Sequence, residues 1–206
     1  MSSHAQLPRI YSLGLIGYPL TGSLSPHLHA AALEAMGLRG DYRLYPISPS
    51  PQEDAQLAEL VDQVRTGRIQ GLNVTIPHKQ TVLAQLDGLT DSAEMIGAVN
   101  TIFREQNRAV GDNTDAPGFL RDLERLLGTK FPENQRPLPD AVPGMALVLG
   151  AGGAARAVVC ALWRSGWQVA VAARRPTQAQ EIVSDFLGIA STPLQESRRL
   201  EAIPLD

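Results

Sequence analysis

The sequence predicts an α/β protein, and three observations support that fold class. Short apolar runs alternate with amphipathic helical segments along most of the chain, as strands alternate with the helices that cover them. A glycine-rich turn, Gly150 to Gly153, follows one such apolar run and opens an Ala-rich helical pattern. A stretch with several prolines and few apolar residues, 129–144, separates that second part from the first.

The first part is predicted to begin with a buried strand, Ile10–Gly17, followed by a helix that starts at Ser25 as its cap and stops at Gly37. Pro26 fits the first helical position, and the apolar face would hold residues such as Leu28 and Met36. The next expected elements are a strand Asp41–Ile47, a helix Gln52–Thr66 with an inward stripe at Leu57, Leu60, Val61 and Val64, and a strand Ile69–Thr75.

Two short helices, about Gln80–Gln85 and Asp91–Ile96, are expected after that third strand. Strands Val99–Arg104 and Ala109–Asp112 would flank a turn at Gln106-Asn107. A helix Asp115–Leu127 closes the first part, with five residues expected to point inward: Phe119, Leu120, Leu123, Leu126 and Leu127. Alternation of strands and helices predicts parallel layers.

The second part reads as strand Ala146–Gly150, helix Gly153–Ser165, strand Gln168–Ala173 and helix Thr177–Leu187. Residues 188–206 are expected to add one more strand and a short charged helix. The order strand, glycine turn, helix places backbone N–H groups at a helix N-terminus, where a dinucleotide pyrophosphate can bind. A complete domain of this type has about six strands, so we expect an incomplete Rossmann-type nucleotide-binding domain.

Composition excludes several classes of protein. The 206 residues carry a net charge of −3, which argues against a nucleic-acid or membrane surface, and contain one cysteine, Cys160, so no intramolecular disulfide can form. Neither a secretory leader nor an apolar run long enough to span a membrane is visible, and we expect a cytoplasmic protein. His27 and His29 would face different directions on their helix, so we expect no metal site.

Polar side chains stand at the junctions between predicted strands and helices. Each has an ordinary structural interpretation: Ser25 as a helix cap, Lys79 as a surface charge, Asn100 as a turn amide and Asp115 as a cap. Together with Ser23 and Thr75 they supply hydroxyls, an amide, a cation and a carboxylate where open α/β sheets bind ligands. Such a set suits a small, carboxylated, polyhydroxylated ring.

Five segments in this order and spacing resemble the shikimate dehydrogenase family: SLSPHLH, NVTIPHK, IGAVNT, GDNTDAPG and GAGGAARA. The resemblance extends from about Ile10 to about Leu187. It implies NADPH-dependent, reversible reduction of 3-dehydroshikimate to shikimate, in chorismate and aromatic amino acid biosynthesis. It also implies a substrate-binding domain at 1–114, a connecting helix and Pro-rich linker at 115–144, and a partial NADP-binding Rossmann domain at 145–206.

The resemblance implies roles for individual residues. Lys79 and Asp115 would be the catalytic pair, and Ser23 and Ser25 would hold the substrate carboxylate. The ring hydroxyls would be bound by Thr75, Asn100 and Asp115. The cofactor would be bound by Gly150, Ala151, Gly152, Gly153 and Ala154, with Asp91 at an acidic position that the family associates with the cofactor side.

The residues after the second strand of the nucleotide-binding part favour NADP over NAD. NAD-binding chains place an acidic residue there to accept from the ribose 2′-hydroxyl, whereas this chain has Ala173-Arg174-Arg175. The guanidinium groups of Arg174 and Arg175 could clamp a 2′-phosphate instead. The family's common Asn-Arg-Thr is absent here, and Ala155 replaces the third fingerprint glycine.

Two alternatives stay open at this point: a non-catalytic, shikimate-like ligand sensor, and a dehydrogenase that also uses quinate. Ser25, rather than threonine, favours shikimate over the bulkier quinate, and His78 is expected to be an exposed neighbour of Lys79. Members of the family continue beyond the length of this chain, so we expect the 206 residues alone to have low stability and weak or no turnover. Partners would be the small-molecule substrate and no nucleic acid or membrane, with the protein a monomer or a homodimer.

Overall fold

The computed structural model describes residues 10–128, 144–189 and 199–205. The chain divides into two compact units: Met1–Leu89 with Val99–Asp112, and Thr90–Ala98 with Asn113–Asp206. The second unit therefore includes a segment, Thr90–Ala98, that lies within the range predicted for the N-terminal domain. The predicted linker 129–144 falls almost wholly outside the described residues.

The first unit contains a six-stranded sheet with the order β2-β1-β3-β5-β6-β4. β1 pairs in parallel with both β2 and β3, whereas β5 runs antiparallel to β3 and to β6. The sheet thus combines the predicted parallel pairing with the predicted pair of strands around Gln106 and Asn107, both with positive φ, where a tight turn makes β5 and β6 antiparallel. The strands span β1 Ile10–Gly17, β2 Arg39–Pro46, β3 Gly71–Val74, β4 Gly88–Leu89, β5 Thr101–Glu105 and β6 Arg108–Asp112.

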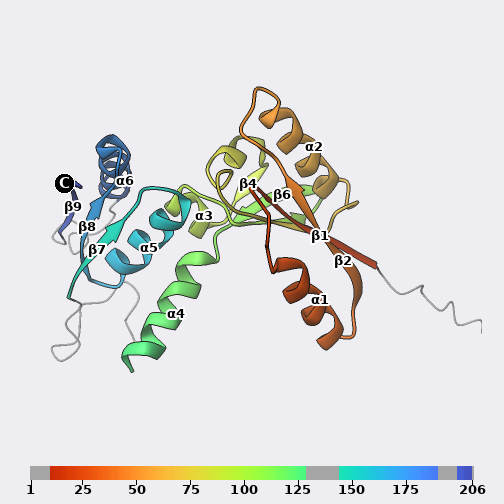
Figure 1. Cartoon of the computed structure of the whole chain (residues 1–206), viewed down its shortest axis with the longest axis horizontal. Coiled ribbons are helices and arrows are strands. Elements are labelled where there is room, and N and C mark those ends of the chain that lie inside the picture. The colour runs from red at the N-terminus through yellow and green to blue at the C-terminus, as the bar shows by residue number, and fades with distance from the viewer. Residues whose placement is uncertain (1–9, 129–143, 190–198, 206) are drawn as a thin grey trace, which may run out of the picture. The chain divides into compact units, whose positions relative to one another are not determined.

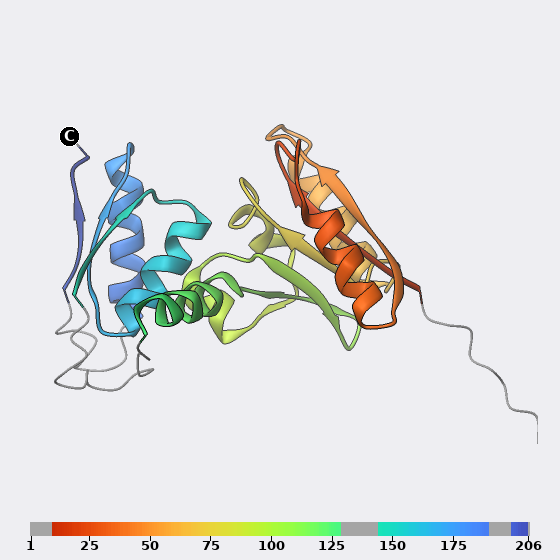
Figure 2. The same ribbon diagram turned by 60° about the horizontal axis from the view of Figure 1, so that its bottom comes forward.

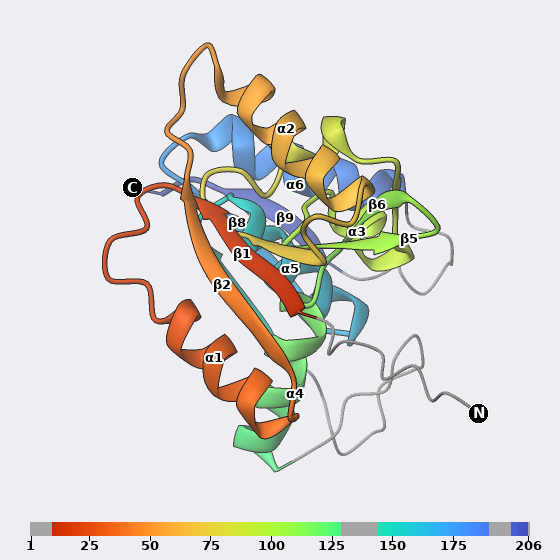
Figure 3. The ribbon, with the colours of Figure 1, turned by 90° about the vertical axis from the view of Figure 1, so that its right-hand side faces the viewer.

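Helices α1 (Ser25–Ala35) and α2 (Glu53–Arg65) lie on opposite faces of this sheet (Figures 1 and 3), and a 3₁₀ helix, η1 (Thr81–Gln85), follows β3. The predicted inward stripe of α2 is confirmed, because Leu57, Leu60, Val61 and Val64 are all buried. In α1 only Leu33 is buried, so the predicted apolar face with Leu28 and Met36 is wrong. Both of those side chains are exposed, because no described element packs against that side of the helix.

The second unit contains a three-stranded parallel sheet with the order β7-β8-β9. Helices α5 and α6 both lie on one face of this sheet (Figure 2), as right-handed crossovers between consecutive strands require. Its core packs Trp163 of α5 against Phe186 of α6, with ring centroids 6.3 Å apart. The elements are α3 Asp91–Ile96, α4 Asp115–Leu127, β7 Met145–Leu149, α5 Gly153–Arg164, β8 Gln168–Ala172, α6 Pro176–Gly188 and β9 Leu200–Ile203.

Helix α4 is amphipathic, but only part of its apolar face is covered. Phe119, Leu120 and Leu123 pack against the core of the second unit. Leu126 and Leu127, which we expected to point inward, are 81% and 51% exposed. The prediction is wrong for these two residues because the described part of the chain supplies no neighbour for the last turn of the helix. The strand predicted in residues 188–206 is confirmed as β9, and the charged helix predicted there falls partly outside the described residues.

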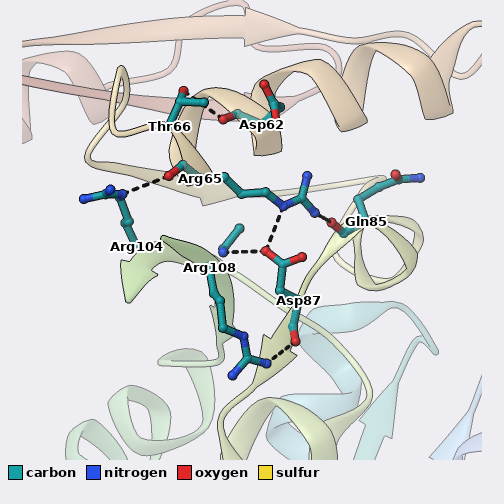
Figure 4. A network of polar contacts seen from close by, with 8 residues as sticks. Asp62, Arg65, Thr66, Gln85, Asp87, Arg104 and Arg108 are labelled. Carbon is teal, nitrogen blue, oxygen red and sulfur yellow. Dashed lines mark hydrogen bonds and ion pairs between the residues drawn. The ribbon is translucent and has the colours of Figure 1, made fainter. Parts of the chain in front are cut away.

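A polar clamp joins α2 to the far end of the first sheet (Figure 4). Arg65, the last residue of α2, donates to the Asp87 carboxylate at 2.7 Å and to the carbonyl of Gln85 at 2.5 Å. The same carboxylate oxygen accepts from the Ala109 amide of β6 at 2.8 Å, and Arg104 of β5 donates to the Arg65 carbonyl at 2.9 Å. The hydrogen bond from Arg65 is the main cause that lowers the pKa of Asp87 below its usual value.

We expect Arg65→Ala to destabilise the first unit by about 1 kcal/mol at pH 7, and to accelerate amide exchange at Ala109. Because the folded-state pKa of Asp87 is depressed, the clamp contributes fully above the unfolded pKa, and that contribution is lost as pH falls through the folded value. The difference between wild type and variant should therefore shrink in acid. Urea unfolding followed by circular dichroism measures it, with Arg43→Ala, which removes an exposed pair with Asp41, as the matched control. Equal losses in both variants would contradict the clamp's role.

Strand β7 presents an exposed apolar face. Met145, Leu147 and Leu149 alternate along it and are between 56% and 70% exposed. β7 is also an edge strand of its sheet in the described part of the chain. An exposed apolar edge strand is a template for pairing with another chain.

We expect the 206-residue chain to self-associate as its concentration rises, and Leu147→Lys to reduce that association by placing a charge on the apolar edge. Analytical ultracentrifugation over a concentration series measures this. Gln180→Lys, which adds the same charge on an exposed face of α6, is the control and should leave association unchanged. Association that is unaltered in Leu147→Lys would show that β7 is not the contact.

Candidate functional site

Three of the predicted substrate residues meet in one cavity of the first unit. Ser23, Ser25 and Thr75 line a hollow of about 400 Å³, together with Leu15, Pro19, Leu20, Thr21, Gly22 and Ile76. The cavity lies where β1 and β3 end, because these strands pair in parallel and their carboxyl ends reach the same edge of the sheet. The Thr75 amide donates to the Ile16 carbonyl at 2.8 Å, which fixes the two chain segments side by side.

The two serines stand at the start of α1. Leu24 occupies the N-cap position without a side-chain hydrogen bond, so the prediction that Ser25 caps the helix is wrong. Instead, the Ser25 amide donates to Oγ of Ser23 at 3.3 Å, and Ser25 is the first residue of the helix. A hydroxyl that accepts in this way keeps its own proton available for a ligand oxygen. The positive end of the helix adds to the preference for an anion here.

Asn100 is held between strands at the same edge of the sheet. Its amide donates to the Asp112 carbonyl at 3.0 Å, and its carbonyl accepts from the Val74 amide at 2.8 Å. Its side-chain oxygen accepts from the Thr101 hydroxyl at 3.0 Å. The structure therefore places Asn100 beside Val74, the last residue of β3, and the Thr101 hydroxyl orients its side chain.

Lys79 lies half-buried in the turn that follows β3, and its carbonyl accepts from the Val99 amide at 2.7 Å. This bond connects Lys79 to the residue that precedes Asn100. The local backbone thus brings Lys79 and Asn100 into one part of the first unit.

His78, which we expected to be exposed, is fully buried. Its Nδ1 lies 2.9 Å from Oε1 of Glu53 at the start of α2, and its Nε2 lies 2.7 Å from the carbonyl of Ile47. Sequence reasoning missed this residue because its partners are 25 and 31 positions away. The side chain turns inward while Lys79, the next residue, stays at the surface of the site.

Both ring nitrogens of His78 face oxygen atoms. The two contacts join the buried ring to α2 on one side and to the segment after β2 on the other. His78 therefore pins the turn that carries Lys79 to α2 and to the segment after β2.

Asp115 belongs to the second unit, where it is the first residue of α4. Thr114 occupies the N-cap position, so Asp115 is not the cap. The Asp115 amide donates to Oδ1 of Asn113 at 3.0 Å, and the buried Asn113 side chain donates in turn to the Ala98 carbonyl at 2.8 Å. Asn113 is a positioning residue that no local pattern singles out, because its partner lies 15 residues earlier.

The glycine turn forms an open cradle at the start of α5. Gly150 has a φ of +119°, which favours glycine, and Gly152 is the N-cap residue of the helix. A side-chain carbon added at either position would meet no atom within 4 Å, so the space in front of these backbone groups is open. The first N–H groups of any helix lack intrahelical acceptors, and this cradle therefore fits a pyrophosphate.

The two arginines follow the neighbouring strand. β7 and β8 pair in parallel with Leu149 opposite Ala172, so the loops after these strands emerge at one edge of the sheet. Arg174 and Arg175 are exposed there, and Arg175 directly precedes α6. The edge thus offers the cradle for a diphosphate and two cations for a further phosphate.

Arg156 anchors the helix that follows the glycine turn. Its buried guanidinium donates to the Ile96 carbonyl at 2.7 Å and to the Asp185 carboxylate at 2.6 Å, and lies 5.7 Å from the ring centroid of Phe186. Asp91 begins α3 and lines a separate cavity of about 400 Å³ with residues of α4 and α5. Its lining contains no residue of the glycine turn, and a cofactor contact for Asp91 stays a prediction.

Metal-binding clusters and membrane-spanning helices are both absent from the described residues. No group of three or more His, Cys, Asp or Glu side chains is arranged there to hold a metal ion. None of the helices in ranges 10–128, 144–189 and 199–205 has both the length and the apolar character needed to cross a bilayer.

We expect His78→Gln to destabilise the first unit by about 1–3 kcal/mol, because it replaces a fully buried side chain whose two ring nitrogens both face oxygen atoms. Urea unfolding followed by circular dichroism measures the change. His27→Gln, on an exposed face of α1, is the matched control and should stay within about 0.5 kcal/mol of wild type. Similar stabilities of the His78→Gln and His27→Gln variants would contradict the role of His78 in holding this turn.

Comparison with known proteins finds similar sequences and structures. Residues 15–102 match the family model described as the shikimate dehydrogenase substrate binding domain. Over 195 residues the chain is 43% identical to the NADP(+) shikimate dehydrogenase of Geobacter metallireducens, covering 94% of this chain and 61% of that protein.

Solved structures agree in fold. A shikimate dehydrogenase in complex with NADP+ aligns at a TM-score of 0.76 and 30% identity, covering 98% of this chain and 65% of that one. The enzyme of Thermus thermophilus in complex with NADP(H) and shikimate aligns at 0.69 and 36% identity, covering 94% of this chain and 63% of that one. The chain spans a little over three fifths of the length of these relatives. By its sequence matches and its fold, the chain is similar to shikimate dehydrogenases over most of its own length.

Proposed function

We propose that this chain carries the substrate-binding and cofactor-binding residues of an NADP-dependent shikimate dehydrogenase, which interconverts 3-dehydroshikimate and shikimate. The observation that carries the proposal is the cavity of the first unit, where Ser23, Ser25 and Thr75 meet at the positive end of a helix. A carboxylated ring with hydroxyl groups is the ligand that these donors suit. The resemblance in the sequence and the names of the relatives agree with that ligand class.

In this proposal each polar residue of the first unit has one task. Ser23 and Ser25 donate to the substrate carboxylate, and the N-terminus of α1 stabilises its charge. Thr75, just after β3, and Asn100, just before β5, bind ring hydroxyls. Asp115 of α4, in the second unit, binds a further hydroxyl. Serine rather than threonine at position 25 supports shikimate over the bulkier quinate as the preferred substrate.

The cofactor is proposed to be NADP. The cradle from Gly150 to Ala154 fits the pyrophosphate, because it lies at the N-terminus of α5 and a side-chain carbon added at Gly150 or Gly152 would meet no atom within 4 Å. Arg174 and Arg175, at the same edge of the sheet, would bind the 2′-phosphate, where an acidic residue would be expected for NAD. When bound, the reduced cofactor supplies a hydride to the ring ketone carbon.

Lys79 and Asp115 are proposed to handle the proton. The Lys79 ammonium donates to the oxygen of the ketone as it becomes a hydroxyl, and in the reverse direction the amine accepts that proton. The role of the Asp115 carboxylate is to orient the ammonium and to favour its charged form. His78 contributes indirectly, since it fixes the turn on which Lys79 stands.

The protein is proposed to work in the cytoplasm as a monomer or a homodimer, with small molecules as its partners. These statements rest on composition and on the proposed activity.

In a chain extended to the length of its relatives, we expect Lys79→Ala to lower kcat for NADPH oxidation with 3-dehydroshikimate by roughly 10²–10⁴-fold, since it removes the proton donor. The dissociation constant for shikimate, measured by titration calorimetry, should change only a few-fold. Arg68→Ala, which removes an exposed cation just before β3, is the control for both measurements.

Three outcomes would contradict the proposal. Wild-type chain that binds neither shikimate nor NADP would overturn the ligand assignment. Turnover that is unchanged in Lys79→Ala would overturn the role of the lysine. Tight shikimate binding without any turnover, in a chain extended to the length of its relatives, would favour the ligand-sensor alternative.

A further inference from the structure

The turn that carries Lys79 is held by one inward side chain. Within residues 75–80, His78 is buried, whereas its neighbours are exposed or half-buried. The backbone of His78 also closes the turn, because its amide donates to the Thr75 carbonyl at 2.9 Å and its carbonyl accepts from the Val82 amide at 3.0 Å. Thr75 and Lys79 therefore take their places on either side of a single anchored residue.

The contact at Nε2 ties the His78 ring to the edge of the sheet that carries the proposed carboxylate cavity. Nε2 lies 2.7 Å from the Ile47 carbonyl, and the Ile47 amide donates to the Gly17 carbonyl at 3.1 Å. Gly17 is the last residue of β1, and a side-chain carbon added there would clash with Cγ2 of Thr75, a residue of the cavity wall. The ring is thus referenced to the cavity through the backbone of Ile47.

The contact at Nδ1 comes from a helix outside the cavity. Glu53 is the first residue of α2, which covers the face of the first sheet opposite to α1 (Figure 3), and its Oε1 lies 2.9 Å from Nδ1 of His78. None of the described residues that line the cavity belongs to α2. A ring held at one nitrogen can still pivot about that contact, whereas contacts at both nitrogens fix its plane. Glu53 therefore completes the orientation of His78.

The position of His78 is transmitted directly to Lys79, the next residue. The Lys79 carbonyl accepts from the Val99 amide at 2.7 Å, so the backbone of Lys79 is held between this bond and the anchored imidazole. Proton transfer requires the donor and acceptor atoms to lie within hydrogen-bond reach. A displacement of about 1 Å at a reacting group can lower a rate by about 100-fold. Small changes in the anchor should therefore affect the reaction more than they affect substrate binding.

We infer that Glu53 is a positioning residue for proton transfer: its carboxylate orients His78, and His78 sets the position of the Lys79 ammonium relative to the carboxylate cavity. The inference rests on the proposed function, because that function assigns proton transfer to Lys79. Loss of the Glu53 carboxylate lowers kcat and leaves substrate binding by Ser23 and Ser25 nearly intact. The task thus falls to a residue of α2 that lies outside the cavity.

Steady-state kinetics in a chain extended to the length of its relatives tests this split between kcat and KM. We expect Glu53→Ala to lower kcat for NADPH oxidation with 3-dehydroshikimate by about tenfold, and to change KM by less than about threefold. Glu53→Gln should keep kcat within about threefold of wild type, because its amide offers Nδ1 both a donor and an acceptor, whichever form the ring takes. Asp54→Ala, which removes the exposed carboxylate beside Glu53 in the first turn of α2, is the matched control and should leave kcat and KM unchanged.

Amide hydrogen exchange in the 206-residue chain tests the anchor without any turnover. The Val99 amide reports on the turn, because it donates to the Lys79 carbonyl. We expect Glu53→Ala to accelerate exchange at Val99 by about tenfold, the size of one lost hydrogen bond. The amides that pair β5 with β6 report on global unfolding and should keep their wild-type rates. Asp54→Ala should leave exchange at Val99 unchanged.

A double-variant cycle tests whether Glu53 acts through the ring of His78. Adding Glu53→Ala to His78→Phe should lower kcat no further. Additive losses would overturn the inference, and so would unchanged kcat or unchanged Val99 exchange in Glu53→Ala. Equal losses of kcat in Glu53→Gln and Glu53→Ala would also overturn it, because they would assign the effect to charge. With an active wild type, each of these results leaves the proposed function standing. An extended wild-type chain without turnover would overturn the proposed function and the inference together.

Discussion

The parallel pairing of β1 with β3 is the constraint on which the candidate site depends. It brings the end of each strand to one edge, where the Thr75 amide bonds to Ile16 and the Tyr18 amide bonds to the Ile76 carbonyl at 2.9 Å. Gly17 allows this close approach, because a side-chain carbon there would lie 2.4 Å from Cγ2 of Thr75. The serines that follow β1 and the lysine that follows β3 are thereby held in one region, although they are far apart in the chain. No pairwise contact between those side chains is needed to assemble the cavity.

In the second unit, too, parallel strand pairing brings separate loops to one edge of the sheet. Parallel pairing of β7 with β8 brings the glycine turn and the arginine pair to one edge, so the two parts of the proposed phosphate site lie on two successive loops. Arg156 then ties α5 to the end of α3 through the Ile96 carbonyl. Gly97 follows that carbonyl with a positive φ, and a side-chain carbon there would lie 2.8 Å from the guanidinium. The guanidinium of Arg156 therefore occupies the space that a side chain at position 97 would need. This contact holds α5 against the segment at Ile96 and Gly97.

The sequence predicts the features that depend on local pattern, and it fails where distant segments supply the partner. Strand β1, the stripe of α2 and the helix at Asp115 follow from periodicity and from turn residues, and the structure has them. The two-residue strand β4 has no periodicity to detect. His78 was expected at the surface, because nothing near it in the chain indicates that Glu53 and Ile47 will enclose it. Tyr42 was not singled out either, because its partner Asn73 lies 31 positions away in the chain.

Edge strand β2 thus contributes to the site through polar contacts more than through burial. Most of its residues are exposed or half-buried, yet Tyr42 within it bonds to Asn73, and the carbonyl of Ile47 just after it accepts from His78. The first contact joins β2 to β3, and the second supports the turn that carries Lys79. An apolar edge strand could pair with β1 in the same way, but it could not make the side-chain bond to Asn73. The polar contacts at β2 therefore hold Asn73 and His78 in place. The burial of its residues alone would contribute little to the stability of the sheet.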